Sequence, residues 1–186
     1  MEEKQIDKKN VIKECVGLVV YLLVILLATY LVIHYVGQRT KVDGSSMENT
    51  LSDGDNLIVD KISYRFHEPE RFDIIVFPYL YKEKTYYIKR IIGLPGETVQ
   101  ITIDGTILIN GEELVESYGR EIIKNPGTAW EPVTLGADEY FVLGDNRNNS
   151  SDSRAEDVAL IKRENIIGKA WLRIYPFDKI GFIRHQ

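Results

Sequence analysis

Residues Val16 to Val36 read VGLVVYLLVILLATYLVIHYV, and this run divides the chain into two unlike parts. No Asp, Glu, Lys or Arg occurs between Glu14 and Arg39. At ~1.5 Å per residue, a helix of this length crosses the ~30 Å hydrocarbon core of a bilayer. A buried helix of a soluble protein would usually be shorter and interrupted by polar residues. The run therefore predicts a transmembrane anchor over residues 16–36.

The flanks of this run indicate a permanent anchor and its orientation. A cleaved targeting peptide has an apolar region of ~7–15 residues followed by an Ala-x-Ala type of motif, which is missing here. Four lysines precede the run, namely Lys4, Lys8, Lys9 and Lys13. Only Arg39 and Lys41 follow it closely. Because positive charge favours the cytoplasmic side, we expect a cytoplasmic tail over residues 1–15 and an extracytoplasmic domain over residues 37–186.

Composition excludes several classes of function. The chain has 28 acidic and 23 basic residues, a formal net charge of −5, whereas nucleic-acid binders need basic surface. A single cysteine, Cys15, excludes an internal disulfide and a thiolate zinc cluster. The three histidines (His34, His67 and His185) leave little material for a metal site or a Ser-His-Asp triad. We therefore expect no metal and no nucleic-acid partner.

After the anchor the sequence is typical of β-structure. Six short segments rich in Ile, Val, Tyr and Phe predict strands at Asn56–Val59, Asp73–Phe77, Thr85–Ile92, Thr98–Ile103, Thr106–Ile109 and Glu139–Leu143. Asp104-Gly105 predicts a two-residue hairpin turn, and Asn110-Gly111 predicts another tight turn. Residues 112–137 show weak periodicity and predict a surface insertion. The expected fold class is mostly β: one N-terminal transmembrane helix followed by a compact, largely antiparallel β domain.

A serine on a glycine-containing turn is the first candidate for chemistry. Residues 42–47 read VDGSSM, so Ser46 lies ten positions beyond the apolar run. A hydroxyl exposed on such a turn can attack a carbonyl, and nearby N–H groups can receive the oxyanion that develops. Most serine-rich turns are only turns, so this segment by itself leaves both interpretations open.

A lysine inside an apolar strand is the candidate base for Ser46. His67 lies in the polar segment HEPER, which is typical of a solvated loop. Strand alternation places Lys89 on one face with Tyr87 and Ile91, in apolar surroundings. Burial lowers the pKa of a lysine from ~10.4 by up to ~3–5 units, and only the neutral amine can accept a proton. The alternative is a side chain that extends from the strand edge to water.

A dense polar segment, residues 144–154, follows the last expected strand. It reads GDNRNNSSDSR, with two Asp, three Asn, two Arg and three Ser. It lacks the glycine and closing glutamate of an EF-hand loop, so calcium binding is not expected. Ion pairs could stiffen it, between Asp152 and Arg154 and between Asp145 and either Arg90 or Arg147. A solvated turn is the alternative.

Four segments in this order behind an anchor resemble the type I signal peptidases, the membrane-bound Ser/Lys proteases of family S26. The matching boxes are VDGSSMENTL (42–51), RFDIIVF (71–77), YIKRIIGLPGE (87–97) and GDNRNNSSDSR (144–154). The resemblance implies an integral-membrane serine endopeptidase that cleaves N-terminal signal peptides from exported preproteins. It also implies that no metal or organic cofactor is needed.

The resemblance further implies roles for matching residues. Ser46 would be the nucleophile, with its N–H in the oxyanion hole, and Lys89 would be the general base. Ser150 would hydrogen-bond the lysine amine. The supporting network would contain Asp152 and Arg154 as an ion pair, with Asp145 and Arg90 nearby. Some relatives have a serine at the position of Gly44 as the second oxyanion donor, and glycine leaves that donor open.

One position departs from the family pattern close to the chemistry. The family usually has proline two residues after Met47, where this chain has Asn49. Losing proline frees φ and restores an N–H, so we expect a less rigid turn and slower or altered cleavage. Substrate is expected to bind as an added β-strand, with small side chains entering shallow pockets.

Two other classes of protein compete with this interpretation. The first is a non-catalytic membrane protein that uses the β fold for binding or assembly, and Asn49 is its best support. The second is a self-cleaving Ser/Lys regulator of the DNA-damage type. That class is soluble and DNA-binding, so the anchor and the acidic net charge oppose it.

Overall fold

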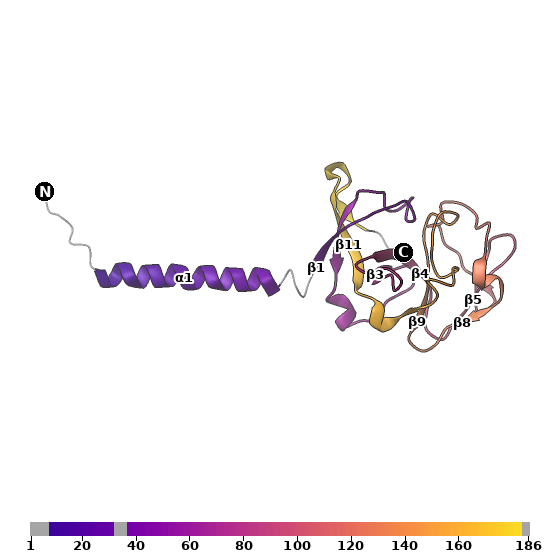
Figure 1. Cartoon of the computed structure of the whole chain (residues 1–186), viewed down its shortest axis with the longest axis horizontal. Helices are drawn as coiled ribbons and strands as arrows, with labels where there is room; N and C mark the ends of the chain where they lie inside the picture. The colour runs from indigo at the N-terminus through magenta and orange to yellow at the C-terminus, as the bar shows by residue number, and fades with distance from the viewer. Residues whose placement is uncertain (1–7, 32–36, 184–186) are drawn as a thin grey trace. The chain divides into compact units, whose positions relative to one another are not determined.

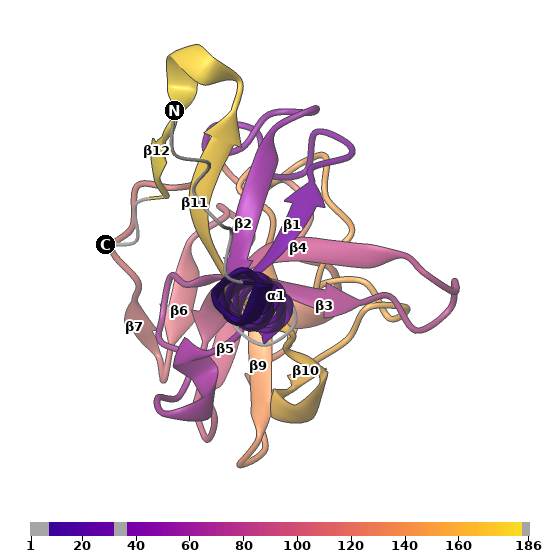
Figure 2. The same cartoon turned by 90° about the vertical axis from the view of Figure 1, so that its left-hand side faces the viewer.

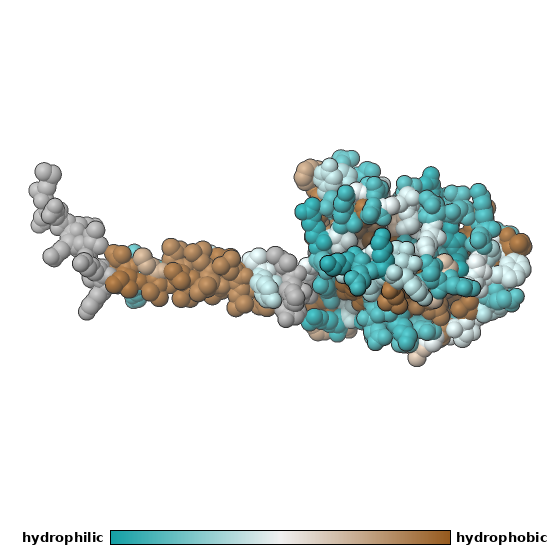
Figure 3. Space-filling view, in the orientation of Figure 1, coloured by the Kyte–Doolittle hydropathy of each residue, from teal (hydrophilic) through white to brown (hydrophobic). Residues whose placement is uncertain are grey.

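The computed structural model describes residues 8–31 and 37–183, and the chain divides into two units at Gly37–Gln38. The first unit contains α1 (Lys8–Leu31), whose segment Val11–Leu31 is long and apolar enough to cross a membrane. Its large apolar side chains are exposed, and they colour the helix brown in Figure 3. Exposing this much apolar surface to water is unfavourable, so the helix is suited to a bilayer. The last five residues of the predicted span, 32–36, lie outside the described residues.

The second unit is built on an eight-stranded sheet (Figures 1 and 2) with the order β1-β2-β11-β3-β4-β9-β10, and with β12 paired to β11. Its strands are β1 (Gly37–Lys41), β2 (Asn56–Asp60), β3 (Ile74–Pro78), β4 (Tyr86–Gly93), β9 (Glu139–Leu143), β10 (Ile161–Lys162), β11 (Gly168–Tyr175) and β12 (Gly181–Phe182). The pairings of β11 with β2, β3 and β12, and those along β3-β4-β9-β10, are antiparallel. The expectation of a mostly β, largely antiparallel fold is confirmed.

A smaller four-stranded sheet has the order β7-β6-β5-β8. Its strands are β5 (Thr98–Ile101), β6 (Ile107–Ile109), β7 (Glu112–Glu113) and β8 (Val133–Thr134). Between β5 and β6, the Thr102 N–H donates to the Thr106 carbonyl at 2.9 Å, so the hairpin loop has three residues and not the predicted two. Gly105 takes a φ of 85°, as the last position of such a loop requires. Asn110 and Gly111 form the predicted tight turn, with φ values of 54° and 86°.

Residues 112–137, predicted to be a surface insertion, contribute β7, β8 and a short 3-10 helix, η3 (Gly127–Trp130). Three apolar residues of this stretch, Ile123, Ala129 and Leu135, are buried against the smaller sheet. Part of the stretch is therefore core and not surface.

Three hydrophobic clusters hold the second unit together. The first is formed by Ile92, Val99, Ile101, Ile107, Ile109, Ile123, Ala129, Leu135, Phe141 and Leu143. The second is formed by Tyr64, Ile75, Phe77, Ile91, Tyr140, Val142, Ile161 and Ile166. The third is formed by Val42, Met47, Leu51, Leu57, Ile74, Ala170 and Ile183. Since β4 and β9 each contribute to the first two clusters, these strands are covered on both faces, and Lys89 and Arg90 of β4 are buried between them.

Candidate active site

The turn that carries Ser46 is fixed by buried apolar neighbours. Met47 and Leu51 are both 0% exposed and belong to the same cluster as Val42. Within the turn, the Leu51 N–H donates to the Met47 carbonyl at 2.8 Å, and the Glu48 N–H donates to the Ser45 carbonyl at 3.1 Å. We call residues 45–51 the nucleophile turn. Its buried anchors leave Ser46 little freedom to move.

Strand β4 brings Lys89 to this turn. Lys89 lies opposite Ile75 of β3, and its side chain is buried, with the residue 3% exposed. Its Nζ donates to Ser46 Oγ at 2.8 Å and to the Ile88 carbonyl at 3.0 Å. The Tyr87 ring lies 4.9 Å from the same nitrogen. The alternative in which Lys89 extends to water is therefore wrong.

Burial decides the protonation of this lysine. Desolvation lowers the pKa of Lys89 from 10.5 to about 8, although the carboxylates of Asp152 and Asp145 act in the opposite direction. Burial disfavours the ammonium because the cation loses its water. The amine is therefore neutral in an appreciable fraction of molecules near neutral pH, so it can accept a proton from Ser46 Oγ.

A second turn, residues 144–150, binds the backbone carbonyls of Ser45 and Ser46. We call it the polar turn. Asn146 donates its N–H to the Ser46 carbonyl and its Nδ2 to the Ser45 carbonyl, both at 3.0 Å. Asn149 Nδ2 donates to Ser45 Oγ at 2.9 Å. These two asparagines were not predicted as site residues. The signal available was three Asn within residues 144–154, but no pattern showed which of them would reach Ser45 or Ser46.

Arg90 and Asp145 form a fully buried ion pair. Arg90 donates through Nε to Asp145 Oδ1 at 2.8 Å and through NH2 to Oδ2 at 2.7 Å, and both side chains are 0% exposed. Thr50 Oγ1 donates to Asp145 Oδ2 at 2.5 Å and so joins the nucleophile turn to the pair. Of the two partners considered for Asp145, the structure selects Arg90. Arg147 pairs with Glu116 at 2.8 Å.

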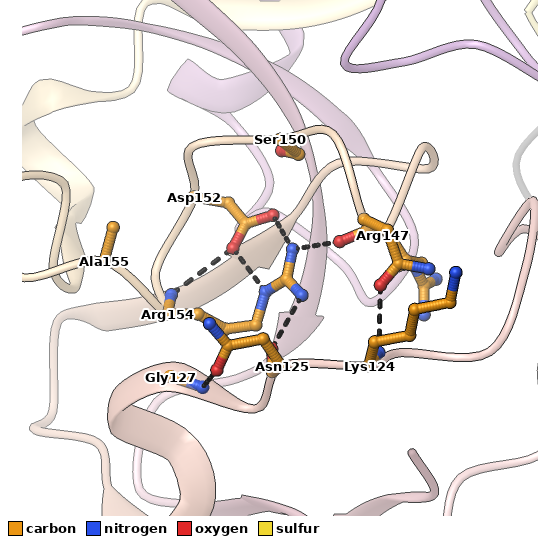
Figure 4. Close-up of a pocket in the computed structure, with 9 residues that line it drawn as sticks. Lys124, Asn125, Gly127, Arg147, Ser150, Asp152, Arg154 and Ala155 are labelled. Carbon is orange, nitrogen blue, oxygen red and sulfur yellow. Dashed lines mark hydrogen bonds and ion pairs between the residues drawn. The ribbon is translucent and has the colours of Figure 1, made fainter.

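Asp152 and Arg154 also pair as expected, beside a pocket of about 310 Å³ (Figure 4). Arg154 donates through Nε to Asp152 Oδ1 at 2.8 Å and through NH2 to Oδ2 at 2.9 Å. Asp152 Oδ2 also accepts the Gly144 N–H at 3.0 Å, and Arg154 NH2 donates to the Arg147 carbonyl at 2.6 Å. This pair therefore supports the polar turn at Gly144 and at Arg147.

A small cavity of about 70 Å³ lies beside the serine and the lysine. Its lining includes Thr40 and Lys41 of β1, Val76 of β3 and Tyr86 of β4, together with Ser46 and Lys89. Its volume suits a small side chain. Among residues 8–31 and 37–183, no group of three or more His, Cys, Asp or Glu side chains is placed to hold a metal ion.

Comparison with known proteins decides the family. A family model described as signal peptidase, peptidase S26, matches residues 12–175. The chain belongs to this family. It is accordingly a serine peptidase of the signal peptidase I type. All four sequence boxes lie inside the matched region.

Two relatives with the name signal peptidase I agree with this assignment. The chain is 45% identical over 154 residues to a signal peptidase I of Leptolyngbya laminosa, covering 79% of this chain and 73% of the relative. It is 36% identical over 186 residues to a signal peptidase I of Bacillus licheniformis, covering 96% and 97%. A crystal structure of a signal peptidase I from Enterococcus faecalis aligns with a TM-score of 0.46 at 36% identity, over 55% of this chain and 97% of that one.

Ser150 of this signal peptidase does not make the hydrogen bond that the family resemblance implies. Its Oγ is buried and has no hydrogen-bond partner among the described residues. The Lys89 amine is directed instead to Ser46 Oγ and the Ile88 carbonyl. The Ser150 hydroxyl packs against Gly144, so close that a Cβ at position 144 would overlap it. The expected Ser150–Lys89 contact is therefore absent from this structure.

Two further positions of the peptidase bear on the turn around Ser46. Gly44 has a φ of 95° and donates its N–H to Asp53 Oδ1 at 2.8 Å, so it stabilises the turn and offers no side-chain donor to an oxyanion. Asn49 has a φ of 100°, and its Nδ2 donates to the Tyr118 carbonyl at 3.2 Å. The turn at Asn49 is therefore tied to another segment, and the lower rigidity expected from the loss of proline stays a prediction.

None of the described histidines is a contact of Ser46, and two of the three histidines fall outside the described residues. His67 is exposed in the segment after the short 3-10 helix η2 (Ser63–Arg65). His34 and His185 fall outside the described residues. Lys89 is thus the basic side chain that contacts Ser46.

Proposed function

We propose that this chain is an integral-membrane signal peptidase in which Ser46 is the nucleophile and Lys89 is the general base. The observation that carries the proposal is the 2.8 Å hydrogen bond between Lys89 Nζ and Ser46 Oγ, made by a buried lysine whose pKa falls to about 8. A serine hydroxyl is a weak nucleophile until a neighbouring base takes its proton. The pair supplies that base without a histidine.

The proposed reaction is acyl transfer through Ser46. Neutral Lys89 takes the hydroxyl proton as Ser46 Oγ bonds to the substrate carbonyl carbon, and the oxyanion is received by the Ser46 N–H. The resulting lysine ammonium then gives its proton to the leaving amine as the peptide C–N bond breaks. This leaves an ester on Ser46. Lys89 next removes a proton from water as the water attacks the ester, and it returns that proton to Ser46 Oγ as the signal-peptide carboxyl leaves.

The ion pairs support this cycle by their charge and by their rigidity. The carboxylates of Asp145 and Asp152 favour the ammonium form that Lys89 takes during acylation. Each carboxylate is neutralised in turn by a bidentate arginine, Arg90 or Arg154. Burial of the amine outweighs the two carboxylates, so the pKa of Lys89 falls to about 8, where the amine can both take and return a proton.

The proposed substrates are the signal peptides of exported preproteins. We infer that α1 holds the peptidase in the membrane with residues 1–15 cytoplasmic and the β domain outside, as the lysine bias before the anchor predicts. A preprotein's cleavage site follows an apolar segment that remains in the same bilayer, so the anchor raises the local concentration of enzyme. The small cavity beside Ser46 would accept a small side chain just before the scissile bond.

The dyad is tested by two substitutions and their matched controls in the full-length protein. Ser46→Ala and Lys89→Met should each reduce cleavage of a purified preprotein by more than ~10³-fold, since removal of nucleophile or base abolishes acylation. Ser151→Ala and Lys82→Met change an exposed serine and an exposed lysine, and they should retain wild-type cleavage. Wild-type cleavage by either dyad variant would refute the assignment.

The orientation is tested separately by thiol labelling. In a Cys15→Ser background, Gln5→Cys is expected to resist a membrane-impermeant maleimide added to intact cells. Val115→Cys, on the exposed surface of the second unit, is expected to react. The reverse pattern would contradict the orientation without affecting the dyad.

A further inference from the structure

The segment Glu116–Arg120 contacts both turns of the site, and we call it the strap. The Glu116 carboxylate accepts the N–H groups of Tyr118 at 2.7 Å and Gly119 at 3.2 Å, which fixes the strap as a tight turn. The same carboxylate pairs with Arg147 at 2.8 Å, where the two side chains are 10% and 2% exposed. The strap is therefore anchored to the polar turn.

Two residues of the nucleophile turn also bind the strap. Asn49 Nδ2 donates to the Tyr118 carbonyl at 3.2 Å, and Glu48 accepts a hydrogen bond from the Arg120 guanidinium. The Arg120 N–H donates to the Asp145 carbonyl at 2.8 Å. The strap thus joins the nucleophile turn to the polar turn through both backbone and side-chain bonds.

The Tyr118 ring covers the buried ion pair beneath the strap. Its centroid lies 3.5 Å from the Arg90 guanidinium carbon. Thr50 Oγ1 accepts a hydrogen bond from Arg90 NH2 at 3.2 Å and donates to Asp145 at 2.5 Å. A guanidinium stacked on an aromatic face is stabilised when water is excluded. The ring therefore helps to hold the charged pair that fixes Thr50 in the nucleophile turn.

Asn49 combines two properties that this connection needs. Its φ of 100° is a backbone conformation that asparagine tolerates better than most residues, whereas proline is locked near −65°. Its side-chain amide supplies the donor for the strap. The residue that departs from the family pattern is thus one of the two, with Glu48, that connect the nucleophile turn to the strap.

We propose that the strap is a positioning element for Ser46 and that Asn49 is the positioning residue through which it acts. The inference rests on the proposed role of Ser46 as nucleophile. A displacement of ~1 Å in a reacting group lowers a rate by ~10²-fold, so a bond that fixes the turn affects turnover more than binding. Asn49 does not contact the amine of Lys89, so it is expected to leave the pH midpoint of the reaction unchanged.

The test is Asn49→Asp in the full-length protein, measured by preprotein cleavage and by acylation of Ser46 with a serine-reactive probe. Aspartate has the same shape but presents an oxygen in place of the N–H donor. We expect kcat and the acylation rate to fall by about three- to tenfold, the range given by one hydrogen bond, with KM and the pH midpoint unchanged. Asn49→Gly keeps the left-handed φ and loses the same bond without adding a charge, so its kcat should fall by about the same factor.

The matched control is Asn110→Asp. Asn110 also has a positive φ, 54°, but it lies in the tight turn between β6 and β7. This variant should keep the wild-type kcat. If it lost as much activity as Asn49→Asp, the effect would reflect a charge at a strained turn, and the proposal would be overturned.

A charge exchange across the strap gives an independent measurement. The side chains of Arg120 and Glu48 are 51% and 38% exposed, so their substitution should not prevent folding. Glu48→Arg and Arg120→Glu each place like charges in contact and should lower kcat. The double variant restores the opposite charges and should recover most of it. Equal kcat in wild type, the two single variants and the double variant would count against a positioning role of the strap.

The outcomes separate the two proposals. If Ser46→Ala still cleaves, the proposed function fails whatever the strap variants do. If Ser46→Ala is inactive but Asn49→Asp has wild-type kcat per folded molecule, the strap alone fails. A change confined to the melting temperature or to KM would likewise reject positioning, because a purely structural or substrate-binding role would then explain it.

Discussion

At the scale of single residues, Lys89 should determine how the reaction depends on pH. Its amine must be neutral to accept a proton, and burial lowers its pKa to about 8. The rate of Ser46 acylation should therefore rise ~10-fold per unit through the acid range and level off above the pKa of Lys89. Acylation measured with a small neutral probe avoids substrate titration. A rate that is flat with pH, or that falls as Lys89 loses its proton, would contradict the assignment.

The same burial makes Lys89 costly for stability. The pKa of Lys89 is near 8 in the folded protein and 10.5 ordinarily, so the buried charge destabilises the fold, and the penalty is complete at pH values below 8. That penalty disappears as pH rises through the interval between them. At neutral pH, Lys89→Met should therefore have a higher free energy of unfolding than wild type, by a net of about 2 kcal/mol once the loss of the lysine hydrogen bond is subtracted. Denaturant unfolding measures this difference.

The control for this measurement is pH itself. Above the ordinary pKa of lysine, Lys89→Met should lose its advantage, because the amine is neutral in both the folded and the unfolded chain. Lys82→Met, at an exposed position, should show no such pH-dependent gain. A Lys89→Met variant that is less stable than wild type at neutral pH would show that the hydrogen bond outweighs the burial of the charge.

At the scale of elements, the end of β9 fits closely against the nucleophile turn. A Cβ on Gly144 would lie 2.5 Å from the Ser46 carbonyl oxygen and would overlap the Ser150 hydroxyl. Gly144→Ala should therefore displace Ser46 and lower kcat at least ~10-fold, with a stability loss of about 1–3 kcal/mol.

Gly181→Ala in β12 is the matched control for Gly144→Ala. No heavy atom lies within 4 Å of the Cβ that alanine would add there. Its activity and melting temperature should stay near wild type. If Gly144→Ala behaved in the same way, the two turns would have room to separate without loss of function.

The buried pair between β4 and the polar turn should be important for folding. Asp145→Asn would leave the Arg90 guanidinium buried without its counter-charge, which typically costs about 3–5 kcal/mol. Denaturant unfolding of the full-length variant measures this loss. A cost below ~1 kcal/mol, as for surface pairs, would show that water reaches the pair despite the Tyr118 ring.

At the scale of the whole molecule, the anchor and the β domain should have separable contributions. The second unit contains all three hydrophobic clusters and both proposed dyad residues. A chain restricted to residues 38–186 should therefore acylate a soluble probe within about twofold of the full-length rate. Its cleavage of a preprotein embedded in vesicles should fall by ~10²-fold or more, because membrane tethering no longer raises the effective concentration. Equal cleavage of the embedded preprotein by both chains would refute the role of the anchor.

The local sequence was enough to predict the apolar helix and six strands. Residues 16–31 carry a long uninterrupted apolar run, and the segments that became β2 to β6 and β9 are short, β-branched and bounded by turn residues. These signals lie within a few neighbouring residues, so no tertiary knowledge is needed to read them. The boxes of Ser46 and Lys89 also suggest a pairing of these two residues through their resemblance to a family, and the structure places Lys89 Nζ 2.8 Å from Ser46 Oγ.

Strand β11 (Gly168–Tyr175) was missed although it lies between β2 and β3 in the larger sheet. Its sequence, GKAWLRIY, mixes charged and apolar residues, and its pairing with β2 contains two register shifts. Strict alternation is therefore lost, and the strand is defined by its partners on both sides.

Residue types and their order show which chemical groups are available: a serine on a turn, a lysine in an apolar strand, and carboxylates and arginines in a polar segment. Their partners follow from the packed fold, which pairs Lys89 with Ser46, Arg90 with Asp145 and Glu116 with Arg147, and leaves the Ser150 hydroxyl without the expected partner. Hydrogen bonds and ion pairs between residues far apart in the chain depend on sub-ångström placement by the packed core, and residue type and spacing do not encode that placement locally.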